Sequence, residues 1–202
     1  MKTIFDTLTL PAFRERPGLY IGSRNLQTLE TWMQGYMSAC EDADEPCRLE
    51  TPNGLPIALL RDYIALQEKD RSVGGIAYIL SNAANGQNEM AWARFFTHLD
   101  DFMRLEIVGV RRLQVTDGMK QFALSQSGHF EIADGKEVPR VFKMKTLTKS
   151  LLSNGLCWVT VVETDQEERI FKEPWRYSIL PGRKADEAIM NWFGTAEWEA
   201  FR

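Results

Sequence analysis

The sequence has few cysteines and histidines, and their spacing does not match a known catalytic or metal-binding motif. Cys40, Cys47 and Cys157 are an odd set, which we expect to be reduced thiols of a cytosolic protein. His98 lies three residues before Asp101, an arrangement open to two interpretations: a base with its orienting carboxylate, or a partly exposed histidine on a helix surface. Ligand sets for zinc or calcium are also missing, so we predict no catalytic residues, no metal site and no cofactor.

Long apolar runs and an excess of basic residues are also missing. No run reaches membrane-spanning length and no signal peptide is visible, so we expect a cytoplasmic protein with no membrane partner. The net charge is −4; residues 1–105 hold 10 Lys/Arg against 14 Asp/Glu, and residues 106–202 hold 14 of each. This balance argues against direct nucleic-acid binding and is compatible with a basic partner.

The most distinctive stretch is Arg-Pro-Gly-Leu-Tyr-Ile-Gly at residues 16–22. Pro17 fixes its own φ and disfavours helix at Arg16, and the two glycines tolerate positive φ. Leu19 and Ile21 are predicted to insert into a core, and Ser23 or Asn25 to cap the helix that Leu26 begins. We therefore predict an architectural corner whose motif residues are Arg16, Pro17, Gly18, Tyr20 and Gly22.

Helical periodicity dominates the first half of the chain. We expect a short helix within residues 3–14, interrupted or begun near Pro11, and a firmer one over residues 26–40, in which Gly35 marks the close approach of another element. Further helices are predicted over 56–68, over 73–84 with a stop at Asn85-Gly86, and over an aromatic stretch from 92 to 103 capped by Asn88.

The pattern changes after residue 105 to short β-favouring runs. We expect strands at residues 107–115, 122–125, 129–133, 138–145, 157–163, 169–172 and 175–180. We also expect a turn at Asp134-Gly135, a short helix at 146–153 that stops at Asn154-Gly155, and a terminal helix after Pro181-Gly182. The predicted fold class is α+β, as a single domain over residues 1–202 with a helical subregion at 1–105 and a sheet-rich subregion at 106–202.

One loop is strongly acidic. It covers residues 41–50 and holds five carboxylates and one arginine, and Pro46 and Pro52 favour an irregular loop there. A solvated connection is one interpretation; the other is a phosphate-mimicking loop that steers the chain onto a basic partner. On the second interpretation the partner-binding residues are Glu41, Asp42, Asp44, Glu45 and Glu50.

The corner resembles a segment near the start of the ATPase domain of gyrase B and its relatives. That family needs an asparagine four residues after a helical glutamate, and later an Asp-x-Gly-x-Gly motif. Glu30 has no such asparagine after it, and Asp117-Gly118 and Asp134-Gly135 lack the second glycine. We interpret this likeness as coincidental and expect no nucleotide to be bound.

A longer resemblance covers residues 10–103. The corner, the helix with Trp32-Met33-x-Gly35-Tyr36, the stretch at 75–80 and Phe95-Phe96-x-x-Leu99-Asp100-Asp101-Phe102 resemble a family of small bacterial proteins associated with immunity to polymorphic secreted toxins. The resemblance implies a cytoplasmic inhibitor that binds a cognate toxin or effector domain and has no enzymatic activity. An adaptor or chaperone for a secreted effector is the alternative, and an enzyme of unrecognised type is a third.

Overall fold

The computed structural model describes residues 4–41, 49–116, 130–133, 136–139, 144–164 and 176–193. The chain divides into two compact units, Met1–Glu106 and Ile107–Arg202, close to the change of periodicity at residue 105. The expectation that they form one domain stays a prediction. Helices in the first unit and an antiparallel sheet with a helix in the second confirm the α+β class.

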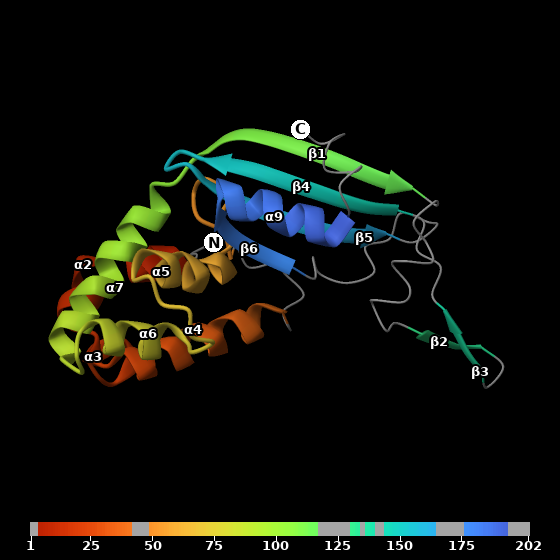
Figure 1. Cartoon of the computed structure of the whole chain (residues 1–202). Helices are drawn as coiled ribbons and strands as arrows, with labels where there is room; N and C mark the ends of the chain where they lie inside the picture. Colours follow the sequence, from red (N-terminus) through yellow and green to blue (C-terminus); the bar gives the residue numbers. More distant parts are fainter. Residues whose placement is uncertain are drawn as a thin grey trace. The chain divides into compact units, whose positions relative to one another are not determined.

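The first unit is a cluster of helices (Figure 1). The segment predicted within residues 3–14 forms two short helices, with Pro11 at the first position of the second. The α5 segment begins with a 3₁₀ turn, and α6 packs against α4, α5 and α7. The elements are α1 Ile4–Leu8, α2 Pro11–Glu15, α3 Gly18–Ile21, α4 Leu26–Glu41, η1 Ile57–Leu59, α5 Leu60–Gln67, α6 Ile76–Ala83 and α7 Asn88–Met103.

The core of this unit is aromatic and aliphatic. The apolar stripe predicted along α7 is buried, with Phe95, Leu99 and Phe102 fully inaccessible. Phe5 and Phe13 from the first two helices are also inaccessible, or nearly so. Long-range burial of this kind, rather than helix propensity, holds such short helices in place.

Several helix-end predictions were confirmed and others were wrong. Asn25 caps α4, since its Oδ1 accepts hydrogen bonds from the amides of Gln27 and Thr28 at 2.7 and 3.3 Å. Asn85 and Gly86 end α6 with positive φ values of 50° and 75°. Asn88 does not cap α7: its side chain donates to the carbonyl of Arg24. Gly35 does not mark a close intramolecular approach, because a Cβ there would have no neighbour within 4 Å.

The second unit contains a four-stranded antiparallel sheet of order β1-β4-β5-β6 and a separate hairpin of β2 and β3. The helix α9 packs on β5 and β6 (Figure 1). The elements are β1 Ile107–Thr116, β2 Phe130–Ala133, β3 Lys136–Pro139, β4 Met144–Leu152, β5 Leu156–Thr164, β6 Arg176–Pro181 and α9 Gly182–Phe193.

The helix predicted at residues 146–153 was wrong. Residues 146–152 belong to β4, which pairs with β1 and β5 on its two sides, and Ser153 lies in the turn that follows. Asn154 and Gly155 close the β4–β5 hairpin, with Gly155 at φ +81° and Asn154 Oδ1 accepting from the amide of Leu156. The pairing on both sides outweighs the local helical pattern. The strands predicted at 122–125 and 169–172 and the turn at Asp134-Gly135 lie outside the described residues.

Candidate functional site

The Arg-Pro-Gly segment forms a short helix. The α2 helix ends at Glu15, and Arg16 leaves helical space at φ −130°. Pro17 is buried and caps α3: its carbonyl accepts hydrogen bonds from the amides of Tyr20 and Ile21, both at 2.9 Å. Gly22 ends α3 in the left-handed region at φ +79°, as predicted. Gly18, by contrast, is the first residue of α3 and does not have positive φ.

The side chains of α3 do not insert into the core as predicted. Leu19 is 76% exposed and Tyr20 is 43% exposed, whereas Ile21 is half-buried. A helix of four residues has too few positions to define an apolar face, and here Pro17 lies buried instead of the leucine. We call Leu19 and Tyr20 the exposed α3 pair.

Tyr20 of the exposed α3 pair packs against a row of aromatic rings. Phe13 is fully buried, and its ring centroid lies 5.3 Å from that of Tyr20 and 5.6 Å from that of Trp32. The row continues from Trp32 to Tyr36 at 6.0 Å, and both of these rings are half-buried. Rigid tyrosine and tryptophan side chains with one free face are the residues that protein interfaces favour at their centres.

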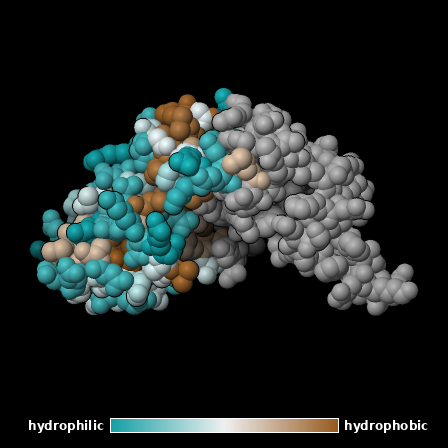
Figure 2. All heavy atoms as spheres, in the orientation of Figure 1, coloured by the Kyte–Doolittle hydropathy of each residue, from teal (hydrophilic) through white to brown (hydrophobic). Residues whose placement is uncertain are grey.

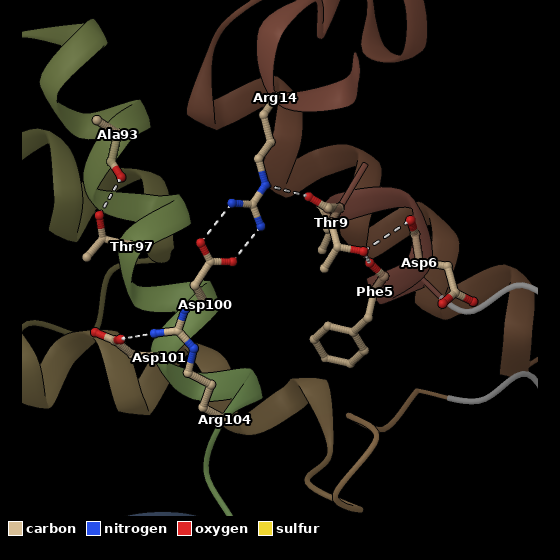
Figure 3. A network of polar contacts seen from close by, with 10 residues as sticks. Phe5, Asp6, Thr9, Arg14, Ala93, Thr97, Asp100, Asp101 and Arg104 are labelled. Atoms are coloured by element: carbon tan, nitrogen blue, oxygen red, sulfur yellow. Dashed lines mark hydrogen bonds and ion pairs between the residues drawn. The ribbon is translucent and has the colours of Figure 1, made fainter. Parts of the chain in front are cut away.

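A charged pair fixes α2 onto α7 beside this row (Figure 3). Arg14 donates to both carboxylate oxygens of Asp100, at 2.8 and 2.5 Å, and its Nε donates to the carbonyl of Leu8. The guanidinium also lies 4.8 Å from the centroid of the Phe96 ring. The hydrogen bonds from Arg14 lower the pKa of Asp100 despite its partial burial. The pair therefore joins α2, the helix that precedes α3 in the chain, to α7.

The strongest cluster of titratable side chains joins the end of α5 to α7. Glu68 accepts hydrogen bonds from Arg94 at 2.7 and 3.0 Å and pairs with His98 Nε2 at 2.6 Å. The side chains of Glu68 and His98 are only 10% and 15% exposed. Burial acts to raise the pKa of Glu68, but the bonds from His98 and Arg94 outweigh it, and the pKa is lowered. The carboxylate partner of His98 is therefore Glu68 and not Asp101, and His98 is partly exposed on α7.

Glu30 closes the amino end of α6 from a neighbouring helix. Its two carboxylate oxygens accept from the amides of Ile76 and Ala77 at 2.8 and 3.1 Å. A Cβ at Gly75 would lie 2.3 Å from Glu30 Oε1, so glycine is required for the carboxylate to reach these amides. Free helix amides and the helix dipole favour a negative group at this position. The role of Glu30 is capping, which the sequence does not indicate because 46 residues separate it from Ile76.

The acidic loop lies mostly outside the described residues. Asp42, Asp44 and Glu45 belong to the undescribed stretch, and Glu41 is the last residue of α4. Glu50 is exposed and forms an isolated antiparallel bridge with Pro56. The partner-binding role of these five carboxylates stays a prediction.

The cysteines differ from one another. Cys40 is part of a disulfide, so the expectation of three reduced thiols was wrong at this residue. Cys157 is a free, buried thiol whose pKa is raised by burial, with nearby Lys149 opposing and Asp186 reinforcing the shift. Lys149 on β4 forms an ion pair with Asp186 on α9, which fastens the helix to the sheet.

Within the described residues, no group of three His, Cys, Asp or Glu side chains could hold a metal ion, and no helix is long and apolar enough to cross a membrane. Comparison with protein families, curated proteins and solved structures found no match. The exposed α3 pair and the Glu68–His98–Arg94 cluster are thus the two candidate sites that the geometry offers.

Proposed function

We propose that this protein is an immunity-type inhibitor that neutralises a cognate toxin domain by binding it through the exposed α3 pair. The observation that carries the proposal is the exposure of Leu19 and Tyr20 in the motif most characteristic of the sequence. An exposed leucine alone needs no explanation. Here it lies next in the chain to a tyrosine that is packed against the buried Phe13 ring, so the tyrosine is presented on a rigid support.

Rigid presentation matters because binding costs conformational entropy. A tyrosine already held by a buried ring loses little freedom when a partner covers its other face. The hydrogen bonds of α3 to Pro17 and the αL stop at Gly22 fix the backbone on both sides of the pair. Such preorganised aromatic anchors supply most of the energy in protein interfaces.

The acidic loop complements this pair in the proposal. Its carboxylates steer a basic toxin cleft toward the chain, which raises the association rate at low ionic strength. Replacing Asp42, Asp44 and Glu45 together by Lys is expected to slow association in dilute buffer and to change it little at high salt. Equal association rates for the triple variant and the parent in dilute buffer would leave the loop as a connection only.

The experiment begins with capture of the partner from the native host and its identification by mass spectrometry. The identified protein is then expressed in a heterologous cell with and without this chain. We expect the partner alone to arrest growth, the parent chain to restore it, and Leu19→Asp to restore it poorly. Val73→Asp is the matched control, because Val73 is a fully exposed apolar residue on the loop before α6. A non-toxic partner would instead favour the adaptor or chaperone alternative.

A second candidate function, acid–base catalysis, rests on the Glu68–His98 pair. A carboxylate that orients an imidazole is a common arrangement in general-base catalysis. In this structure Glu68 also accepts from Arg94, so both of its oxygens connect α5 to α7. Toxin protection that survives Leu19→Asp but fails in His98→Gln, with unchanged thermal stability, would favour this alternative.

A further inference from the structure

The three cysteines of the chain can be assigned by elimination. Cys40 lies in the last turn of α4 and is part of a disulfide, whereas Cys157 on β5 is a free thiol. A disulfide needs a second cysteine, and Cys47 is the one that remains in the sequence. The states of the two described cysteines therefore point to the partner of Cys40, although Cys47 itself lies outside the described residues.

From this assignment we propose that Cys40 and Cys47 form a redox-sensitive cross-link at the carboxyl end of α4. The bond joins two positions seven residues apart and makes residues 40–47 a covalent ring. Four of the five carboxylates of the acidic loop lie inside this ring, and no lysine or arginine lies between the two cysteines. The redox state of the chain therefore determines whether the acidic loop is tied to the end of α4.

The chain is attached to the helical unit on both sides of the ring. Before the ring, Cys40 is only 8% exposed, so its side chain is held by packing. After the ring, the carbonyl of Leu49 accepts a hydrogen bond from the amide of Ile57 at 2.7 Å, and Thr51 is buried. Because the folded chain returns to the unit within a few residues of Cys47, the cross-link requires little additional ordering.

The end of α4 makes the spacing of the two cysteines suitable for a disulfide. The Cα atoms of paired cysteines usually lie about 4.4–6.8 Å apart. Seven residues of continuous helix would separate them by about 10 Å, which is too far. The helix instead ends at Glu41, and Pro46 disfavours helical backbone at Glu45. The chain therefore leaves the helix before it reaches Cys47.

Glutathione disulfide is an oxidant that can form this bond. One protein thiolate attacks glutathione disulfide and releases one glutathione, and the second thiolate then attacks the mixed disulfide and releases the other. The two protein thiols lose two electrons and two protons, and one glutathione disulfide becomes two molecules of glutathione. Reduction runs through the same steps in reverse. In the reducing cytoplasm that the sequence predicts, the bond is open and forms when the surroundings become oxidising.

The cross-link acts on the loop that we propose to steer a basic partner. Carboxylates repel one another, and a covalent ring keeps four of them on one short segment, which strengthens the local negative potential. The oxidised chain is therefore expected to associate with a basic partner faster than the reduced chain at low ionic strength. This expectation rests on the proposed function, whereas the cross-link does not depend on toxin binding.

Disulfide mapping of the full chain, equilibrated with glutathione disulfide, tests the cross-link. Free thiols are alkylated under denaturing conditions, and a glutamate-specific protease then cleaves after Glu41 and Glu45 inside the ring. We expect alkylation of Cys157 alone, and two peptides joined through Cys40 and Cys47 that separate after reduction. Alkylation of all three cysteines, or a bond from Cys40 to Cys157 or to a second copy, would overturn the proposal.

Thermal unfolding with and without a phosphine reductant tests whether the bond constrains the chain. Reduction is expected to lower the thermal midpoint of the parent by about 5 °C or more, because the ring no longer restricts the unfolded chain. Cys47→Ser should match the reduced parent and should not respond to the reductant, whereas Cys157→Ala should keep the response. An unchanged midpoint in the parent, or an equal response in Cys47→Ser, would contradict the proposal. Neither measurement involves a partner, so a failed cross-link is distinguished from a failed toxin proposal.

Discussion

Gly18 and Gly22 lie in the same short motif and have different backbone requirements. Neither would meet a neighbour within 4 Å if it carried a Cβ, but only Gly22 has positive φ, at +79°. Gly22→Ala is therefore expected to reduce the free energy of unfolding by about 1–2 kcal/mol, the cost of a left-handed conformation for an L-residue. Gly18→Ala is expected to be neutral or slightly stabilising.

Chemical denaturation of both variants checks this prediction. A positive φ at Gly18 would predict that Gly18→Val destabilises the fold by about 1–3 kcal/mol. Because Gly18 is helical, that loss from backbone strain is not expected. Equal losses of stability in the two alanine variants would show that the backbone conformation of Gly22 is not the deciding factor.

Glu68 makes the free energy of unfolding of the helical unit depend on pH in the acidic range. Because hydrogen bonds from His98 and Arg94 hold its pKa below the ordinary value, its contribution is present above the unfolded pKa of about 4.3 and is lost as pH falls through the folded pKa. Glu68→Gln is expected to reduce the free energy of unfolding by about 1–3 kcal/mol near neutral pH. The difference between parent and variant should shrink below about pH 4.

Urea denaturation of parent and variant at several pH values measures this difference. Glu89→Gln is the control, because Glu89 forms an exposed pair with Arg24 at 3.2 Å, and exposed pairs contribute little. A Glu68 effect that is constant from pH 3 to 7 would contradict the assignment.

At the residue scale, the sequence predicts those features that depend on a few neighbouring residues. The Asn25 cap, the break at Arg16 and the left-handed Gly22 follow from local chemistry, and all three are present. The exposure of Leu19 is a tertiary property, so the motif alone gave the wrong prediction. The Glu68–His98 pair spans 30 residues and belongs to no motif that would reveal it.

The helix α6 depends on a carboxylate from another element. Glu30→Ala is expected to cost about 1–2 kcal/mol by leaving the amides of Ile76 and Ala77 without a partner. Gly75→Ala alone should also destabilise, because the new methyl group would displace the Glu30 side chain. In the Glu30→Ala background, Gly75→Ala should cost much less.

A double-mutant cycle measured by thermal unfolding gives this coupling directly. Additive losses of stability would show that Gly75 is needed for a reason other than access of Glu30 to the helix end.

At the element scale, periodicity identified α4, α7, β1 and β5 but not β4. In β4, Ser150 and Leu152 are buried and Leu151 is exposed, which is the alternation of a strand. The Asn154-Gly155 pair was interpreted as a helix stop, although the same dipeptide commonly closes hairpins. Val108 and Val110 near the start of β1, and Leu151 on the paired strand β4, are exposed hydrophobic side chains. Figure 2 shows hydrophobic residues at the surface of the described part of the chain.

For the whole molecule, the sequence predicts one domain and the structure divides the chain into two compact units. If the helical unit folds on its own, a fragment of residues 1–106 should show the circular dichroism spectrum of a helical protein and a cooperative thermal transition. Its core of fully buried aromatic residues is the physical reason to expect this. A fragment without a cooperative transition would support the single domain instead.

The α+β class and the helical half could be predicted because both follow from periodicity along the chain. The candidate site could be predicted only in part: the motif is visible in the sequence, but Leu19, which it predicts to insert into the core, is exposed. The sequence points to the acidic loop for partner binding because charge is visible in a sequence, whereas the exposure of a leucine is not.

The proposed function is tested most directly by the affinity of the identified toxin partner for the parent, Leu19→Asp and Val73→Asp, measured by isothermal titration calorimetry. If the exposed α3 pair is the anchor, Leu19→Asp should weaken binding by about 2 kcal/mol or more, roughly thirtyfold, with an unchanged thermal midpoint. Val73→Asp should bind as the parent does. Equal affinities for Leu19→Asp and the parent would contradict the proposal that this protein binds its toxin through α3.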